Sequence, residues 1–461
     1  MRGRGLRTAW RWRERRFGRR AVSGAGAVRT VLLSGLCALL VLPTVGTAPA
    51  AAAEDGRSYA FAPGARDVAG ATGPATAGRL DPGRIYRSSL PRNGRLYYRL
   101  DLTAADTAYV PVTAVPPANA TVSATDGIRV SVQDAQGTPC GYAAARFGAG
   151  LSPRPVTALG QREAGKALCQ GKGTFYVLVE RLDAEGSGTA GPAQRWGLEI
   201  APATEPGPAR AGSTSAPQTW DSATPEPLGG TPRDASGGTG FASARALGQG
   251  VWRTGLVPGE TRFYKVPVDW GRQLNASAEL DGASGHGYVG GALNLSLYNP
   301  VRGYVEEAAL GYTGIRRPAV LTPLPPVEYA NRYAAPAGVT SVRFAGDYYL
   351  VLHLSRQLTG LYGQGPFGVT LQVREAGRAH AGPQYAGRPV PGDAFTLTGP
   401  DQAAALTGGT AGIGSTGGDS GMKLVAIGGI GLGTVLLLVL AVWTLTARRA
   451  QTRVNAQKPT A

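Results

Sequence analysis

The sequence predicts an all-β protein with two tandem β-sandwiches, followed by one C-terminal transmembrane helix. Three observations carry this prediction. Short runs of alternating apolar and polar residues lie between Gly, Pro, Asn and Asp turns, with no convincing amphipathic helix among them. The order of these runs occurs twice. A long uncharged run then follows near the C-terminus.

The uncharged run, 424–447, is predicted to cross a membrane. As a helix rising about 1.5 Å per residue, it is long enough for a hydrocarbon core about 30 Å thick. Lys423 alone precedes it, whereas four basic residues follow: Arg448, Arg449, Arg453 and Lys458. This excess of positive charge predicts a cytoplasmic tail, 448–461, and places the rest of the chain outside the cell. The expected location is therefore the cell membrane.

The N-terminal segment, 1–53, is predicted to be an export signal. Ten arginines and one acid, Glu14, precede the mostly apolar run 31–42, and small residues follow it. A basic region, a short apolar region and small residues describe a cleavable signal peptide, and the alternative is an uncleaved anchor. Paired arginines leave the twin-arginine route open beside the general secretory route.

The formal net charge of +17 is concentrated at the two ends. Once the signal and the tail are set aside, only about +4 remains on the ectodomain, which has no contiguous basic stripe. Nucleic acid is therefore not an expected partner.

The first sandwich is predicted over 79–203, after a flexible lead-in at 54–78. Its clearest strand is 96–102, where four residues alternate with polar or exposed ones and point to one face: Leu96, Tyr98, Leu100 and Leu102. The turn Asn93-Gly94 connects it to the strand before.

The second sandwich, 233–375, repeats this order after a linker rich in Pro, Gly, Ser and Thr at 204–232. The residues Tyr264, Val266 and Val268 take the places of Tyr98, Leu100 and Leu102. A repeat of about 120 to 145 residues favours an internal duplication into two domains. A flexible stalk, 376–422, is predicted to join the second domain to the membrane.

The second copy resembles the bacterial pre-peptidase C-terminal domains, jelly-roll β-sandwiches appended to secreted enzymes. The likeness rests on a Pro-Gly-Glu turn, then FYKVPV (263–268), LNLSLYNP (293–300) and GDYYLVL (346–352). It covers 250–373 well and 83–200 less well, and implies two tandem jelly-roll-like domains. Tandem copies before one anchor look like surface proteins of high-GC Gram-positive bacteria.

In relatives that bind calcium, acids surround the strand that here carries Asn294, Ser296 and Asn299. In the first copy the same positions are Arg129, Ser131 and Asp134. Neutral and basic residues are poor ligands for a hard dication. This departure from the family pattern puts a calcium site in doubt, and the sequence predicts neither a metal nor a cofactor.

Two cysteines remain after loss of the signal, Cys140 and Cys169. In an oxidising compartment an even pair predicts a disulfide, and the alternative is two free thiols.

The sequence offers no catalytic constellation. The three histidines, His286, His353 and His380, lack metal-ligand or triad spacing, and each is interpreted as a solvated or strand-face residue. The tetrapeptide 418–421, GDSG, also occurs around the nucleophile of trypsin-like proteases. Here it lies in the stalk without a protease domain around it, which favours a tether. The protein is therefore not expected to be an enzyme.

Aromatic and arginine residues in the second copy's loops are candidates for recognition, because such side chains supply contact area with little ordering entropy. The candidates are Tyr288, Tyr304, Tyr312, Arg316, Arg317, Tyr329 and Tyr333. The alternative is that these tyrosines cover the open end of the core. In the predicted span, Gly429 and Gly433 have a spacing that allows two helices to approach closely, so a dimer is possible.

The leading functional hypothesis is a non-catalytic cell-surface binding or scaffolding protein that engages a membrane or secreted protein, or the cell wall. The alternatives are an accessory or inactive relative of a secreted hydrolase, and a structural spacer without a ligand.

Overall fold

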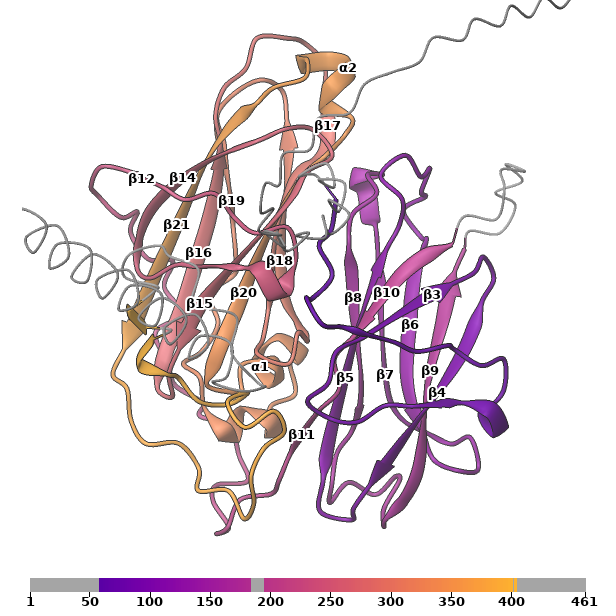
Figure 1. The fold of residues 1–461 in the computed structure, drawn as a ribbon. Coiled ribbons are helices and arrows are strands. Elements are labelled where there is room, and N and C mark those ends of the chain that lie inside the picture. The colour runs from indigo at the N-terminus through magenta and orange to yellow at the C-terminus, as the bar shows by residue number, and fades with distance from the viewer. Residues whose placement is uncertain (1–57, 184–194, 401, 404–461) are drawn as a thin grey trace, which may run out of the picture. The chain divides into compact units, whose positions relative to one another are not determined.

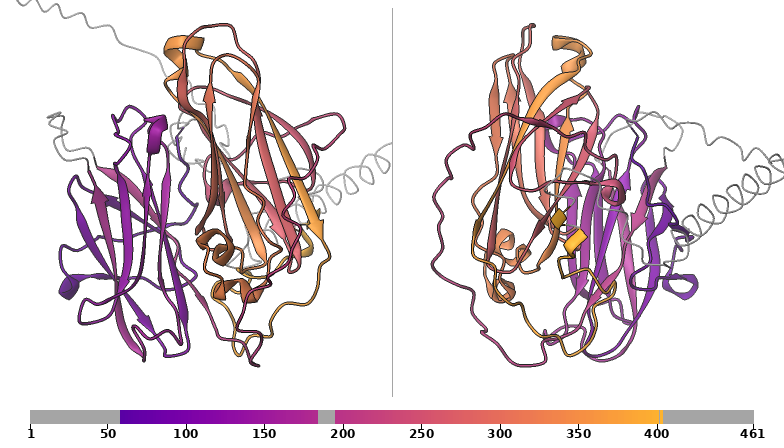
Figure 2. Two further views of the ribbon diagram at one scale, coloured as in Figure 1. Left: turned by 180° about the vertical axis from the view of Figure 1, so that it is seen from behind. Right: turned by 60° about the vertical axis from the view of Figure 1, so that its left-hand side comes forward.

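The computed structural model describes residues 58–183, 195–400 and 402–403, which all fall within one compact unit. These residues form two β-sandwiches, drawn from indigo to orange in Figure 1 and seen from two further sides in Figure 2. Among them, no helix is long and apolar enough to cross a membrane. The predicted signal, the predicted span with Gly429 and Gly433, and the tail lie outside the described residues.

The first sandwich consists of two sheets. One has the order β1-β3-β10-β5-β11, with β8 also paired to β5, and the other has the order β2-β4-β9-β6-β7. The strands of the first sheet are β1 (Arg66–Asp67), β3 (Tyr86–Leu90), β5 (Thr107–Val115), β8 (Val156–Arg162), β10 (Trp196–Ile200) and β11 (Ala203–Glu205). Those of the second are β2 (Gly78–Arg79), β4 (Arg95–Leu102), β6 (Gly127–Gln133), β7 (Pro139–Arg146) and β9 (Gly173–Leu182). Two 3-10 turns, η1 (Pro74–Thr76) and η2 (Gly148–Gly150), lie between strands.

The second sandwich has the sheets β12-β14-β21-β16-β19 and β13-β15-β20-β17-β18. The strands of the first sheet are β12 (Arg233–Asp234), β14 (Gly250–Leu256), β16 (Arg272–Leu280), β19 (Arg317–Val320) and β21 (Phe367–Gly377). Those of the second are β13 (Arg245–Ala246), β15 (Thr261–Val268), β17 (Val289–Tyr298), β18 (Tyr304–Tyr312) and β20 (Gly346–Leu354). The connections hold η3 (Phe241–Ser243), η4 (Tyr329–Tyr333) and the helices α1 (Ala337–Ser341) and α2 (Leu358–Tyr362), of five residues each.

The two sandwiches share one strand order, in agreement with the repeated sequence pattern. The long strands of the second sandwich follow one another along the chain as those of the first do, and each takes the corresponding place in its sheet. Strand β11 is an addition to the first copy. The alternation predicted for 96–102 is also confirmed, because Leu96, Tyr98, Leu100 and Leu102 of β4 are buried. Asn93, in the predicted turn before β4, has a positive φ of 52°, and the Gly94 amide donates to the Pro91 carbonyl at 3.1 Å, so Asn93 is the third residue of a turn over 91–94 that leads from one sheet to the other.

Each sandwich encloses its own apolar core between its two sheets. Trp196 and Tyr98 are central to the first core, and Trp252 and Tyr264 to the second. The predicted disulfide is confirmed: Cys140, on β7, is bonded to Cys169, which precedes β9. It ties an edge strand of the first sandwich to the connection that leads into a central strand.

The segments around the sandwiches are more ordered than the sequence predicts. The described part of the lead-in contains β1, η1 and the first residue of β2, and the linker begins with part of β11. Residues 384–396, expected to be flexible stalk, instead lie along the linker: Thr204 and Val390 exchange backbone hydrogen bonds of 2.8 and 3.0 Å. We call 384–396 the strap. Its composition is rich in small residues, but Phe395 within it is only 1% exposed.

Replacing both cysteines, in Cys140→Ser/Cys169→Ser, is expected to lower the free energy of unfolding by about 3 to 4 kcal/mol. The bond closes a sequence separation of 29 residues and so restricts the unfolded chain. Denaturant unfolding of the variant and of the wild type checks this value, and reduction of the wild type should reproduce the loss. A loss below about 1 kcal/mol would contradict the expectation.

Candidate functional site

The predicted recognition residues fall at two opposite ends of the second sandwich. We call the end formed by the connections 257–260, 281–288, 313–316 and 355–366 apical, and the end formed by 269–271, 299–303 and 321–345 basal. Figure 1 shows α2 at the apical end and α1 at the basal end. The apical candidates are Tyr288, Tyr312, Arg316 and Arg317, and the basal candidates are Tyr304, Tyr329 and Tyr333. The structure therefore does not bring all seven together.

Tyr312 is not a surface residue. It is fully buried, packs against Tyr362 with ring centroids 5.1 Å apart, and donates a hydrogen bond of 2.6 Å to the Asp281 carbonyl. For this residue the alternative interpretation applies, in which a tyrosine closes the end of the core.

Three large apolar side chains are exposed at the apical end: Tyr288 (69% exposed), Ile315 (67%) and Leu361 (41%). We call them the apical patch. Leu361 lies over Gly287, where an added Cβ would come within 3.0 Å of its Cδ1 atom, and Tyr288 lies over Gly311. The loops that carry them are joined by hydrogen bonds from Ala283 N to Gly314 O and from Tyr362 Oη to Gly287 O. Glycine at these two positions, Gly287 in a loop and Gly311 on β18, allows the side chains to rest on neighbouring backbone.

Arginines surround the apical patch. Asp281 accepts hydrogen bonds from Arg253 at 2.7 Å and from Arg316 at 2.9 Å, and Arg316 also lies 3.5 Å from Glu279, so both arginines are paired with acids. Arg317 begins β19 and is exposed, and no acid pairs with it within the described residues. The apical end therefore combines an apolar surface with the exposed positive charge of Arg317.

The basal tyrosines have other neighbours. Tyr304 is 52% exposed but packs edge-on against Tyr298, and the Arg332 guanidinium lies 3.4 Å from the centre of the Tyr329 ring. Tyr333 is 47% exposed. Because Tyr298 and Arg332 belong to the contact described next, this end of the second sandwich adjoins the first.

The two sandwiches cover one outer sheet face of each other. Tyr109 of β5 packs edge-on against Phe344, with ring centroids 5.2 Å apart, and against Phe395 of the strap at 6.4 Å. On the other side of the contact, Tyr59 packs against Phe263 of β15 at 5.7 Å. The contact thus has apolar clusters of its own, separate from the two cores.

Three buried or half-buried ion pairs of the same polarity cross this contact. The first sandwich supplies the acids and the second supplies the arginines: Arg302–Glu199 (2.6 Å), Arg332–Glu205 (2.9 Å) and Arg343–Glu163 (3.4 Å). Glu199 and Glu205 are at most 1% exposed. A fourth pair, Arg154–Glu307 at 3.6 Å, has the opposite polarity.

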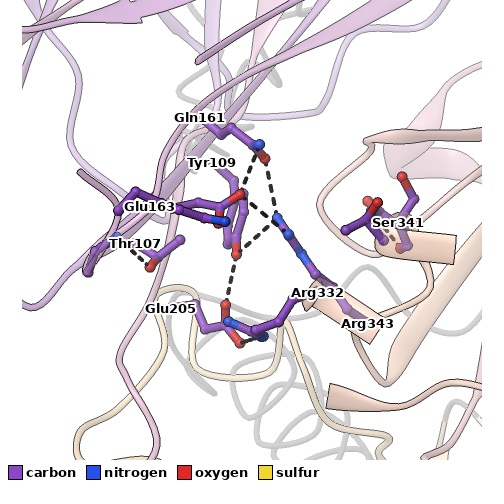
Figure 3. Close-up of polar contacts among 12 residues, drawn as sticks. Thr107, Tyr109, Gln161, Glu163, Glu205, Arg332, Ser341 and Arg343 are labelled. Carbon is purple, nitrogen blue, oxygen red and sulfur yellow. Dashed lines mark hydrogen bonds and ion pairs between the residues drawn. The ribbon is translucent and has the colours of Figure 1, made fainter. Parts of the chain in front are cut away.

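Figure 3 shows how Tyr109 joins two of these pairs. Its hydroxyl donates to Glu205 at 2.8 Å and accepts from Arg343 at 3.5 Å, while Arg343 also reaches Gln161. Burial, more than the opposing effects of Arg343 and Glu205, raises the pKa of Tyr109 well above its ordinary value. The hydroxyl therefore keeps its proton and remains a donor.

His353 of β20 is buried in the same contact, not solvated. Its Nε2 lies 2.9 Å from Ser152 Oγ of the first sandwich, and its Nδ1 lies 2.9 Å from Thr261 Oγ1. This order of groups superficially matches a catalytic triad, but Ser152 is completely buried and Thr261 replaces the acid. Burial, helped by the charge of Arg154, lowers the pKa of His353 to about 3. A neutral, enclosed imidazole suits a structural hydrogen bond.

The remaining histidines and the polar residues at the calcium positions of the second copy are exposed or make structural contacts. His286 is exposed in the loop before β17, and His380 Nε2 lies 2.7 Å from Glu328. Asn294 and Ser296 donate to Glu307, and Asn299 accepts from the Gly303 amide. No group of acids, histidines or cysteines within 58–183 and 195–400 could hold a metal ion. The GDSG tetrapeptide lies outside the described residues.

No family model matches the chain, and no curated protein matches it. Among solved structures, it is similar to the CUB1-EGF-CUB2 domain of human MASP-1/3, at 9% identity and a TM-score of 0.15, covering 63% of this chain and 99% of that one. It is also similar to the tandem CBM22-1-CBM22-2 domain of Paenibacillus barcinonensis Xyn10C, at 13% identity and a TM-score of 0.18, covering 61% and 83%.

A third similar structure is the M60 catalytic domain with the CBM51-1 and CBM51-2 domains of Clostridium perfringens ZmpB, at 10% identity and a TM-score of 0.16. It covers 62% of this chain and 34% of that one. Scores this low do not relate the chain to any of the three by fold or function.

Lowering the pH is expected to destabilise the protein through His353. Between pH 6.5 and about 3 the unfolded imidazole binds a proton that the folded one does not. The stability that depends on the neutral His353 is therefore complete above pH 6.5 and is lost as the pH falls. When the pH falls from 7 to 5, the free energy of unfolding of the wild type should decrease by about 2 kcal/mol more than that of His353→Gln. Denaturant unfolding at both values measures the difference, with the exposed His286→Gln as control; equal losses would contradict this role.

Removing one charge of a buried pair is expected to cost more than removing both. Arg302→Met leaves Glu199 buried without its arginine, and should lower the free energy of unfolding by about 3 to 5 kcal/mol. Arg302→Met/Glu199→Gln leaves no unpaired charge at this place, so its free energy of unfolding should fall by clearly less. Denaturant unfolding of the two variants compares the losses, and a double variant that is the less stable of the two would argue against a compensated pair.

Proposed function

We propose that this chain is a non-catalytic binding protein of the cell surface, built of two jelly-roll-like sandwiches and anchored by 424–447. The observation that carries the proposal is the apical patch, where Tyr288, Ile315 and Leu361 are exposed together on three joined loops. Large apolar side chains gathered on loops at one end of a rigid scaffold are typical of recognition surfaces.

The course of the chain supports an outward-facing role for the patch. Strand β21 begins at the apical end and finishes at the basal end, and the strap that follows remains basal, since Ala394 lies against Gly346 at the start of β20. The chain therefore continues towards its C-terminus from the end opposite to the patch. We therefore propose that the patch points away from the membrane.

The chemistry of the patch favours a protein partner. Two of its three members, Ile315 and Leu361, are aliphatic, and they need an apolar surface to cover them. Arg317 beside them favours a partner that presents an acidic residue at the edge of that surface. A glycan-binding surface would rely on aromatic faces and many polar groups, and here only Tyr288 supplies such a face. Cell-wall binding is therefore the second candidate.

The patch variant Tyr288→Ser/Ile315→Ser/Leu361→Ser is expected to abolish partner capture by chemical crosslinking on intact cells. One crosslinked protein should be recovered with the wild type and fall at least about tenfold with the variant, since central contacts dominate binding energy. Arg317→Glu should weaken capture of the same protein. The matched control is Tyr142→Ser/Leu168→Ser, which removes side chains 69% and 55% exposed from the first sandwich.

Unchanged capture by the patch variant would overturn the proposal. Recovery of cell-wall material alone would favour wall binding, and recovery of nothing would favour a spacer. Because all three substitutions are at exposed positions, the variant should unfold within about 1 kcal/mol of the wild type, which denaturant unfolding checks.

A further inference from the structure

A cleft of about 450 Å³ lies where the two sandwiches and the strap meet. The first sandwich contributes 83–85 and 201–203, the second contributes residues of η3, β15 and β20, and 391–396 of the strap forms another wall. The volume is within the range of small-molecule sites, which occur preferentially at domain contacts. The apical patch takes no part in this cleft.

Paired charges form the floor of the cleft. Lys265 Nζ lies 2.5 Å from Asp347 Oδ2, and their side chains are 15% and 22% exposed. Beside them, Arg302 is held by Glu199 and lies 4.7 Å from the centre of the Phe241 ring. Both signs of charge are thus fixed at mostly buried positions, where they act more strongly on a ligand than at an open surface.

Tyr349 of β20 stands among these charges. Asp347, Arg302, Lys265 and Asp393 all act on its hydroxyl electrostatically, while burial is the main cause of its raised pKa. In the described part of the chain, this hydroxyl makes no hydrogen bond to the protein. It is a neutral donor and acceptor that lines the cleft and can serve a ligand.

The rim carries one charge of each sign. Arg84 comes from the first sandwich and Asp393 from the strap, and both are exposed. Over residues 58–183 and 195–400, neither side chain has an ion-pair partner. The rim therefore repeats the pattern of the floor, with an anion-binding and a cation-binding group together.

We propose that the cleft binds a small zwitterion of the amino-acid or dipeptide class. A ligand with one charge would be attracted by half of these groups and repelled by the other half. A molecule carrying a carboxylate and an ammonium group can place the carboxylate near Arg84, Lys265 and Arg302, and the ammonium near Asp347 and Asp393. Tyr349 is positioned to hydrogen-bond the polar atoms between them.

The test is titration of the full-length protein with the twenty free amino acids and the twenty Gly-Xaa dipeptides, by ligand-observed NMR and calorimetry. At least one of these forty zwitterions should bind. Its N-acetylated and C-amidated forms, which each lack one charge, should bind at least about tenfold more weakly. No binding by any of the forty at millimolar concentration, or equal binding of the capped forms, would overturn the proposal.

Three conservative variants locate the site. Arg84→Gln and Asp393→Asn each remove one rim charge at an exposed position, and Tyr349→Phe removes only the hydroxyl. Each should weaken binding of the zwitterion several-fold, whereas Tyr97→Phe, a half-buried tyrosine on β4 away from the cleft, should not. Equal affinity of the three variants and the wild type would place the ligand elsewhere and overturn the assignment. Because none of these residues belongs to the apical patch, partner capture should be unaffected.

Discussion

The contact between the two sandwiches is the constraint on which the rest of the described structure depends. Glu199 and Glu205 are buried on one side of it, and on the other side Arg302 and Arg343 are buried and Arg332 is half-buried. A buried charge is tolerated only when it is paired, so neither sandwich could keep this surface in the same form alone. The linker, the strap and the cleft take their positions from this contact. The two copies therefore form one compact unit.

The contact also determines which surfaces remain for recognition. Eight of the nine residues of β5 are buried, which means that the strand is covered on both faces. Strand β17 is likewise covered along most of its length. One outer face of each sandwich is therefore occupied by the other copy. At the apical end, glycine-rich loops hold apolar side chains in solvent without a covering segment from the described chain, which is why the patch stands out there.

Local features of the fold could be predicted from the sequence, whereas the contact could not. The alternation in β4, the turn at Asn93 and the disulfide each depend on neighbouring residues or on the simple pairing of two cysteines. The strap depends instead on backbone bonds to Thr204 and on one buried ring, Phe395, so a composition rich in small residues suggested a tether. The tyrosine candidates were chosen by loop position, which does not reveal that Tyr312 points inward.

One signal of the contact was nevertheless present in the comparison of the two copies. On the outer face of the first copy, Arg95, Glu180 and Arg129 are neighbours on adjacent strands, and Arg95 and Glu180 form an exposed ion pair. The same places in the second copy hold Thr261, His353 and Asn294, all neutral and all buried. A duplicated charged row would have brought two arginines and one carboxylate into a buried contact, which leaves one positive charge without a partner. Its replacement by neutral hydrogen-bonding residues is what allows one copy to cover the other, so divergence at this face, more than the shared strand order, explains how two similar domains became one compact unit.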